Sequence, residues 1–238
     1  MTKETIPTVD GPMDVHLEKP QGTGPFPGVV VVQEAYGVNE HVLDVCARFA
    51  RAGYAALAPE IYHRRGAGLA VPYETPAPAM AELGRLTNDG LEVDLDAALE
   101  RLRNEDGVDP VRVGLVGFCV GGFAVFLGAC RLDPAASVAF YGGGIVRARE
   151  GMLLEPVLEE ADAIDAPLLA LFGADDGSIP PTDVGAIRSR LEESGSGSEV
   201  HVYEGAKHAF FNDRRANYHP AVAADAWTRT LDWFGRYL

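Results

Sequence analysis

Residues 114–122 read Gly-Leu-Val-Gly-Phe-Cys-Val-Gly-Gly, and this stretch decides the fold class. The β-branched run 111–116 leads into it, and an apolar run of helical period follows it. A strand that turns this sharply into a helix crowds the residues around the apex, so side chains two positions before and after Cys119 must be minimal. Gly117 and Gly121 occupy those positions. The stretch therefore predicts a strand, a tight turn with Cys119 at its apex, and a helix.

The rest of the chain alternates between short apolar runs and segments of helical period. The other runs predicted as strands, most of them buried on both faces, are 28–33, 54–58, 137–141, 167–172 and 199–203. The segments predicted as helices are 42–50, 91–102, 184–191 and 222–238. This alternation predicts one α/β domain over residues 1–238, with a mostly parallel central sheet and helices on both faces. The loop-like patches 66–78 and 194–198 are too short to separate domains, and residues 1–12 are a candidate flexible N-terminal arm.

The composition restricts the partners and the location of the protein. With 35 acidic and 20 basic residues the net charge is −15, which argues against a nucleic-acid partner because phosphate binding needs clustered Lys and Arg. No stretch approaches the roughly 20 apolar residues that cross a bilayer, and residues 1–12 lack the apolar core of a secretion signal. We therefore expect no membrane partner and a cytoplasmic location. The three cysteines have neither paired nor metal-binding spacing, so we expect reduced thiols and no metal or cofactor.

The turn at Cys119 has the pattern of a nucleophile elbow with cysteine in the serine position. A thiol at a helix N-terminus faces unpaired N–H groups and the positive end of the helix dipole, which both favour the thiolate. The N–H of Val120 supplies half of an oxyanion hole, and the loop after Gln33 should supply the other half. The alternative is that the thiol is a small buried hydrophobe, which is the role we assign to Cys46 and Cys130 on helical faces.

An acid and a histidine follow in the order that this kind of site requires. In nucleophile-elbow enzymes the acid follows a later strand and the histidine follows the last strand. Asp175 and Asp176 come after the run 167–172, and His208 comes after the run 199–203. Either acid could orient the imidazole, and we interpret Asp175 as the turn or cap residue. The other histidines lack a glycine-bearing loop after a late strand, and we interpret them as structural or solvated side chains: His16, His41, His63, His201 and His219.

Six separated segments resemble the dienelactone hydrolase family (carboxymethylenebutenolidases) of α/β-hydrolases, and the likeness runs from Val29 onward. The segments are 33–39, 58–62, 114–122, 140–142, 173–176 and 207–212. The resemblance implies an α/β-hydrolase fold with the triad Cys119, Asp176 and His208. It also implies that Ala35 and Val120 supply the oxyanion N–H groups, and that Glu34 takes the thiol proton when substrate arrives.

Two family features that hold a substrate carboxylate are absent here. The segment 75–80, Thr-Pro-Ala-Pro-Ala-Met, has no arginine, and the position four residues after His208 is Asn212. Ala209 also stands where those family members have a hydroxyl residue. Losing a bidentate arginine removes a strong, oriented contact, so the resemblance does not carry dienelactone over as the substrate. The candidate substrate contacts are Tyr36, Phe118, Tyr141, Phe210 and Arg64.

These observations predict a hydrolase that cleaves a small-molecule ester or lactone through a thioester acyl-enzyme, as a monomer or small homo-oligomer. One alternative is a promiscuous esterase or thioesterase. Comparing hydrolysis rates on small aryl esters with rates on carboxylate-bearing lactones would distinguish it from a lactone hydrolase. A second alternative is a non-catalytic ligand-binding or redox-sensing protein, although a sensor needs neither the acid nor the histidine. Residues 143–162 are the expected position of any lid or pocket element.

Overall fold

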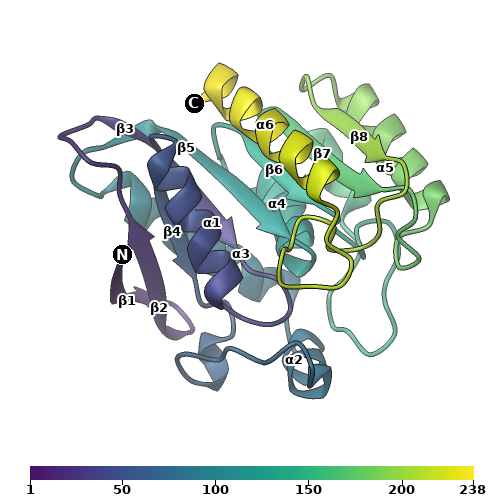
Figure 1. Cartoon of the computed structure of the whole chain (residues 1–238), viewed down its shortest axis with the longest axis horizontal. Coiled ribbons are helices and arrows are strands. Elements are labelled where there is room, and N and C mark those ends of the chain that lie inside the picture. Colours follow the sequence, from purple (N-terminus) through teal and green to yellow (C-terminus); the bar gives the residue numbers. More distant parts are fainter.

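The computed structural model describes residues 1–238 and contains one eight-stranded sheet (Figure 1). The strand order is β1-β2-β4-β3-β5-β6-β7-β8; β1, β2 and β4 pair antiparallel, and all other pairs are parallel. The predicted mostly parallel sheet is thereby confirmed. The strands are β1 Thr2–Thr8, β2 Gly11–Glu18, β3 Phe26–Val32, β4 Ala55–Pro59, β5 Val108–Phe118, β6 Ser137–Phe140, β7 Leu168–Gly173 and β8 Glu199–Tyr203.

Helices cover both faces of the sheet, as Figure 1 shows. Helices α1 and α6 lie on one face, where the Phe49 and Trp227 rings meet with centroids 4.7 Å apart. Helices α3 and α4 pack against each other on the opposite face. The helices are α1 Glu40–Arg51, α2 Pro76–Leu83, α3 Asn88–Arg103, α4 Val120–Arg131, α5 Pro181–Ser194 and α6 Pro220–Tyr237, with short 3₁₀ turns η1 His63–Arg65 and η2 Leu158–Ala163. None of them has both the length and the apolar composition of a membrane-spanning helix.

The first residues differ from the expected flexible arm, because they form a hairpin at one edge of the sheet. Strand β1 pairs with β2 over its whole length. Ile6 is buried against the core, and the Lys3 ammonium lies 2.9 Å from a carboxylate oxygen of both Asp14 and Glu60. The polar sequence of β1, with a single buried side chain, gives no apolar alternation and conceals the strand. Helix α2 is another addition, since it begins at Pro76 within the loop-like patch 66–78 and continues beyond it to Leu83.

The sheet places the candidate residues at one edge of the molecule. Glu34 follows β3, Cys119 follows β5, Asp176 follows β7 and His208 follows β8. These four strands are parallel, so their carboxyl ends meet at the same edge of the sheet. Ligand sites of open α/β sheets lie outside this edge.

Candidate active site

The turn at Cys119 has the strained geometry that its sequence predicts. Cys119 has φ 56° and ψ −114°, a region that side chains with a Cβ rarely occupy. A Cβ at Gly117 would lie 2.2 Å from the carbonyl oxygen of Gly121, and a Cβ at Gly121 would lie 2.4 Å from that of Val32. Only glycine fits at both positions. The result is a half-buried sulfur at the start of α4.

Backbone strain in this protein is concentrated around the same site. Three non-glycine residues have a positive φ: Cys119, Tyr141 at 39° and Ala209 at 61°. Tyr141 directly follows β6, and Ala209 directly follows His208. Strained residues persist only where the surrounding structure holds them, and they gather at functional sites.

The structure pairs His208 with Asp176 and not with Asp175. The His208 Nδ1 lies 2.7 Å from Oδ2 of Asp176, whose side chain is buried, whereas Asp175 is exposed. Burial alone would raise the pKa of Asp176, but hydrogen bonds from His208 and Ser178 outweigh it and lower that pKa. The carboxylate is therefore ionised and accepts from the imidazole.

His208 in turn lies close to the sulfur. Burial lowers the pKa of His208, but the negative charge of Cys119 and the hydrogen bond with Asp176 outweigh burial and raise the pKa to about 10. The Tyr141 ring lies against the imidazole, with centroids 5.1 Å apart. The arrangement can hold a thiolate and an imidazolium as an ion pair.

Two backbone N–H groups lie at the turns that flank the sulfur. Val120 is the first residue of α4, so helix geometry leaves its N–H without an intrahelical acceptor. Ala35 lies in the turn after β3, and its N–H forms no bond to another backbone carbonyl. The Tyr62 hydroxyl donates to the Ala35 carbonyl over 3.0 Å and so fixes the orientation of this peptide. Both predicted oxyanion groups are free to donate to a substrate oxygen.

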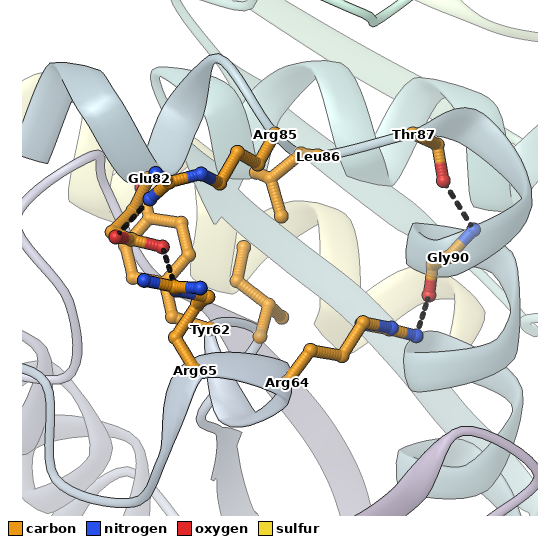
Figure 2. A pocket seen from close by; sticks show the side chains of 9 residues that line it. Tyr62, Arg64, Arg65, Glu82, Arg85, Leu86, Thr87 and Gly90 are labelled. Atoms are coloured by element: carbon orange, nitrogen blue, oxygen red, sulfur yellow. Dashed lines mark hydrogen bonds and ion pairs between the residues drawn. The ribbon is translucent and has the colours of Figure 1, made fainter.

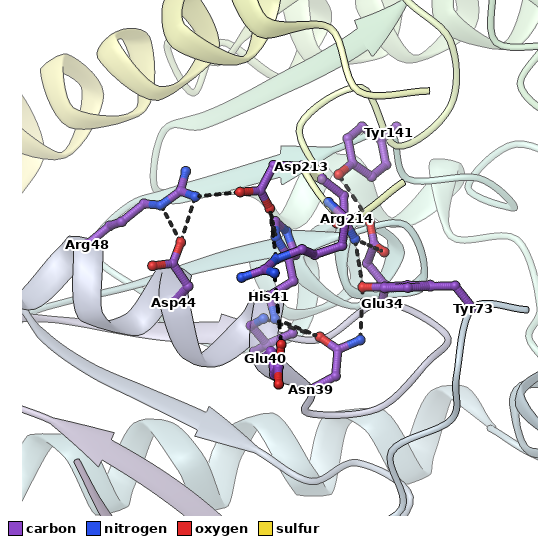
Figure 3. Close-up of polar contacts among 12 residues, drawn as sticks. Glu34, Asn39, Glu40, His41, Asp44, Arg48, Tyr73, Tyr141, Asp213 and Arg214 are labelled. Carbon is purple, nitrogen blue, oxygen red and sulfur yellow. Dashed lines mark hydrogen bonds and ion pairs between the residues drawn. The ribbon is translucent and has the colours of Figure 1, made fainter. Parts of the chain in front are cut away.

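Glu34 is buried and is held by neutral donors. Its Oε1 accepts from the Tyr141 hydroxyl at 3.2 Å, and its Oε2 accepts from Nδ2 of Asn212 at 2.8 Å. Burial and the charge of Glu34 raise the pKa of Tyr141, so the phenol remains a donor. The Asn212 and Asn39 amides both donate to the Tyr73 hydroxyl at 2.9 Å. Figure 3 shows Glu34 between Tyr141 and Tyr73.

The hydrogen-bond network around Glu34 extends through Asn39 to helix α1. The Asn39 side chain caps α1 by accepting from the N–H groups of His41 and Val42. The buried His41 ring lies 3.4 Å from Asp213, which also faces Arg48 (Figure 3). Sequence reasoning treated His41 as structural or solvated, and its position beside the Phe118 and Phe211 rings is that of a buried structural side chain.

The predicted substrate contacts fall into two groups. Tyr36 and Tyr141 border the site, because Tyr36 follows Ala35 and Tyr141 touches both Glu34 and His208. Phe118 and Phe210 are fully buried and pack with Phe140 beneath the turn.

Arg64 is not brought to this cluster. Its guanidinium donates to both carboxylate oxygens of Asp94, to Asp10 and to the Gly90 carbonyl. Figure 2 shows the adjacent hollow, where Glu82 binds Arg65 and Arg85. The three arginines of this hollow are therefore engaged by acids of the protein itself.

Arg215 is not among the predicted substrate contacts, but it lies beside one of them, Tyr36. Its guanidinium lies over the Tyr36 and Tyr73 rings, 5.3 and 5.8 Å from their centroids. It forms no ion pair and no side-chain hydrogen bond. A half-buried guanidinium without an acceptor can receive an anionic group. No group of three or more His, Cys, Asp or Glu side chains is arranged to hold a metal ion.

The fold, the turn at Cys119 and the order of the acid and histidine define an α/β-hydrolase. The model of the dienelactone hydrolase family matches residues 13–238. A Synechocystis sp. protein named "Putative carboxymethylenebutenolidase" is 38% identical over an alignment of 238 positions, which covers 98% of this chain and 95% of that protein. A Bradyrhizobium sp. protein named "Probable 2-oxo-3-(5-oxofuran-2-ylidene)propanoate lactonase" is 30% identical, over 91% of this chain and 86% of its own.

The solved structure named as a putative dienelactone hydrolase from Klebsiella pneumoniae superposes with a TM-score of 0.87 at 35% identity. The match covers 99% of this chain and 98% of that one. This chain belongs to the dienelactone hydrolase family, and it is a hydrolase that acts on carboxylic esters or lactones. The resemblance inferred from the six segments is confirmed.

Proposed function

We propose that Cys119, His208 and Asp176 form a catalytic triad that cleaves a carboxylic ester or lactone through a thioester acyl-enzyme. The observation that carries the proposal is the 2.7 Å bond between Asp176 and His208 beside a sulfur at a strained helix start. Hydrolysis of a panel of lactones and aryl esters by the wild type and by Cys119→Ala tests it.

Acylation begins when the Cys119 thiolate attacks the carbonyl carbon and forms a C–S bond. The N–H groups of Ala35 and Val120 stabilise the negative charge that develops on the carbonyl oxygen. The C–O bond to the leaving group then breaks, and the His208 imidazolium gives its Nε2 proton to the departing alkoxide or enolate. The acyl group remains on sulfur as a thioester.

Deacylation repeats these steps with water as the nucleophile. The neutral His208 takes a proton from water as the oxygen attacks the thioester carbon, and the sulfur leaves as a thiolate. Asp176 keeps the imidazole oriented in both halves of the cycle. An ester gives an acid and an alcohol, while a lactone gives one hydroxy or oxo acid.

In this proposal Glu34 takes the thiol proton when a substrate binds and returns it to the Cys119 thiolate when the product leaves. Tyr141 joins the two parts of the site, because its hydroxyl donates to Glu34 and its ring lies against His208. Because its hydrogen-bond donors are neutral, no salt bridge has to break before Glu34 can accept a proton. Glu34→Gln keeps the shape but cannot take the proton, and kcat/KM should fall by about 10²-fold. Glu40→Gln, an exposed neighbour, is the control, and an unchanged rate for Glu34→Gln would leave His208 as the sole acceptor.

The unpaired Arg215 favours substrates that carry a carboxylate. Arg215→Met keeps the stem over the tyrosine rings but removes the charge. We expect kcat/KM to fall about 10-fold for a lactone carboxylate, as for a lost hydrogen bond to a charged group, and to stay unchanged for the methyl ester of the same lactone. Arg214→Met is the matched control, because Arg214 is exposed beside Glu40 and Asp213. Equal losses of kcat/KM on both substrates would show that Arg215 does not recognise the charge of the substrate carboxylate.

A further inference from the structure

We propose that Ser178 is a positioning residue of this site, whose hydroxyl fixes the Asp176 carboxylate and the tautomer of His208. The proposal rests on the proposed function, since it concerns the acid and base assigned there. Neither the nucleophile-elbow pattern nor the order of acid and histidine along the chain points to this serine.

Ser178 contacts both members of the pair. Its hydroxyl lies 2.6 Å from Oδ1 of Asp176 and 3.2 Å from Nδ1 of His208. Its backbone N–H also donates to Oδ1, over 2.9 Å. The two oxygens of the carboxylate thus have different main partners: Oδ1 accepts both bonds from Ser178, and Oδ2 accepts from Nδ1 of His208 over 2.7 Å.

A hydroxyl has one proton and two lone pairs. Because the shorter bond and the acceptor-only carboxylate lie at Oδ1, the proton goes there, and a lone pair faces the imidazole. His208 can hydrogen-bond to that lone pair and to Oδ2 of Asp176 only if its Nδ1 carries a proton. The neutral ring is then held as the Nδ1–H tautomer, which leaves Nε2 free to take a proton on the side of Cys119.

The serine is itself held in place from outside the turn. The Arg149 guanidinium donates to the Ser178 carbonyl over 3.2 Å and has no carboxylate partner. Arg149 comes from the segment 143–162, where sequence analysis expected pocket elements. The backbone bond from Ser178 to Asp176 already closes the local turn, so the hydroxyl is not needed for it.

The test compares Ser178→Ala, Ser178→Thr and Ser194→Ala, a serine whose hydroxyl bonds within the end of α5. The rate of lactone hydrolysis is measured against pH, and the ¹³C signal of the Asp176 carboxyl is followed in labelled protein. The hydroxyl bond helps to lower the pKa of Asp176, so its loss should raise that pKa. We expect Ser178→Ala to lower kcat about 10-fold with little change in KM, and to move the acidic limb and the carboxyl titration to higher pH. Ser178→Thr should restore both, and Ser194→Ala should change neither.

A Ser178→Ala protein with wild-type kcat and an unmoved carboxyl titration would overturn the proposal. So would a loss of kcat with no shift in either titration, since that result describes a structural role only. If alanine lowers the Tm, Ser178→Cys, with a similar volume and a weak donor, provides the same comparison. The carboxyl titration needs no turnover. The titration therefore still tests whether Ser178 fixes the Asp176 carboxylate, even if Cys119→Ala retains hydrolysis and the proposed triad is refuted.

Discussion

Cys119→Ala is expected to lower kcat for lactones and aryl esters by about 10⁴-fold or more, because it removes the atom that forms the acyl bond. The residual rate comes from the oxyanion groups and from substrate positioning. In the wild type, rapid quenching followed by mass measurement should find an acyl group on the peptide that contains Cys119. Hydrolysis by the alanine variant at close to the wild-type rate would refute the assignment.

The protein supplies its own control thiols. Burial and the charge of Glu160 raise the pKa of Cys130 to about 12, and burial raises the pKa of Cys46 further still. Both side chains are buried, whereas Cys119 is half-buried. Cys130→Ala should therefore keep its activity, and iodoacetamide should label and inactivate the wild type at Cys119 alone.

Much of the fold could be predicted because local patterns determine it. The six runs expected as strands correspond to β3–β8. Most of them are apolar stretches buried between helices, whereas the edge strand β8 is only partly buried. The elbow at Cys119 was predictable from sterics, because the glycines at 117 and 121 are required within the turn itself. The polar edge strand β1 carries no such local signal, so it could not be recognised.

The environment of Glu34 could not be predicted, because it depends on contacts between distant parts of the chain. Asn212, which donates to Glu34, lies 178 positions away along the sequence. Tyr73 comes from a segment without helical or strand period, yet its hydroxyl joins Asn212 to Asn39. Sequence order places an acid after β7 without choosing between Asp175 and Asp176. The family resemblance points to Asp176, and the structure shows Asp176 buried and bonded to His208 while Asp175 is exposed.

The second large effect is expected for Asp176→Asn, with kcat lower by about 10⁴-fold, the loss seen when a triad histidine is held in the wrong tautomer. The N–H and O–H of Ser178 both donate to the Oδ1 position. The new amide must therefore place its oxygen there and turn its NH₂ toward His208. A donor facing Nδ1 makes that nitrogen an acceptor, so the proton of the neutral ring moves to Nε2 and faces the sulfur.

Asp175→Asn is the matched control, since it changes the adjacent acid without touching the imidazole, and its kcat should stay within about 2-fold of the wild type. The pKa of His208 should also fall from about 10 in Asp176→Asn, because the negative charge that helps to hold the imidazolium is gone. ¹⁵N spectra of the imidazole report both the tautomer and this pKa. If Asp175→Asn loses activity while Asp176→Asn keeps it, the acid has been assigned to the wrong residue. If both variants keep it, His208 needs no acid partner.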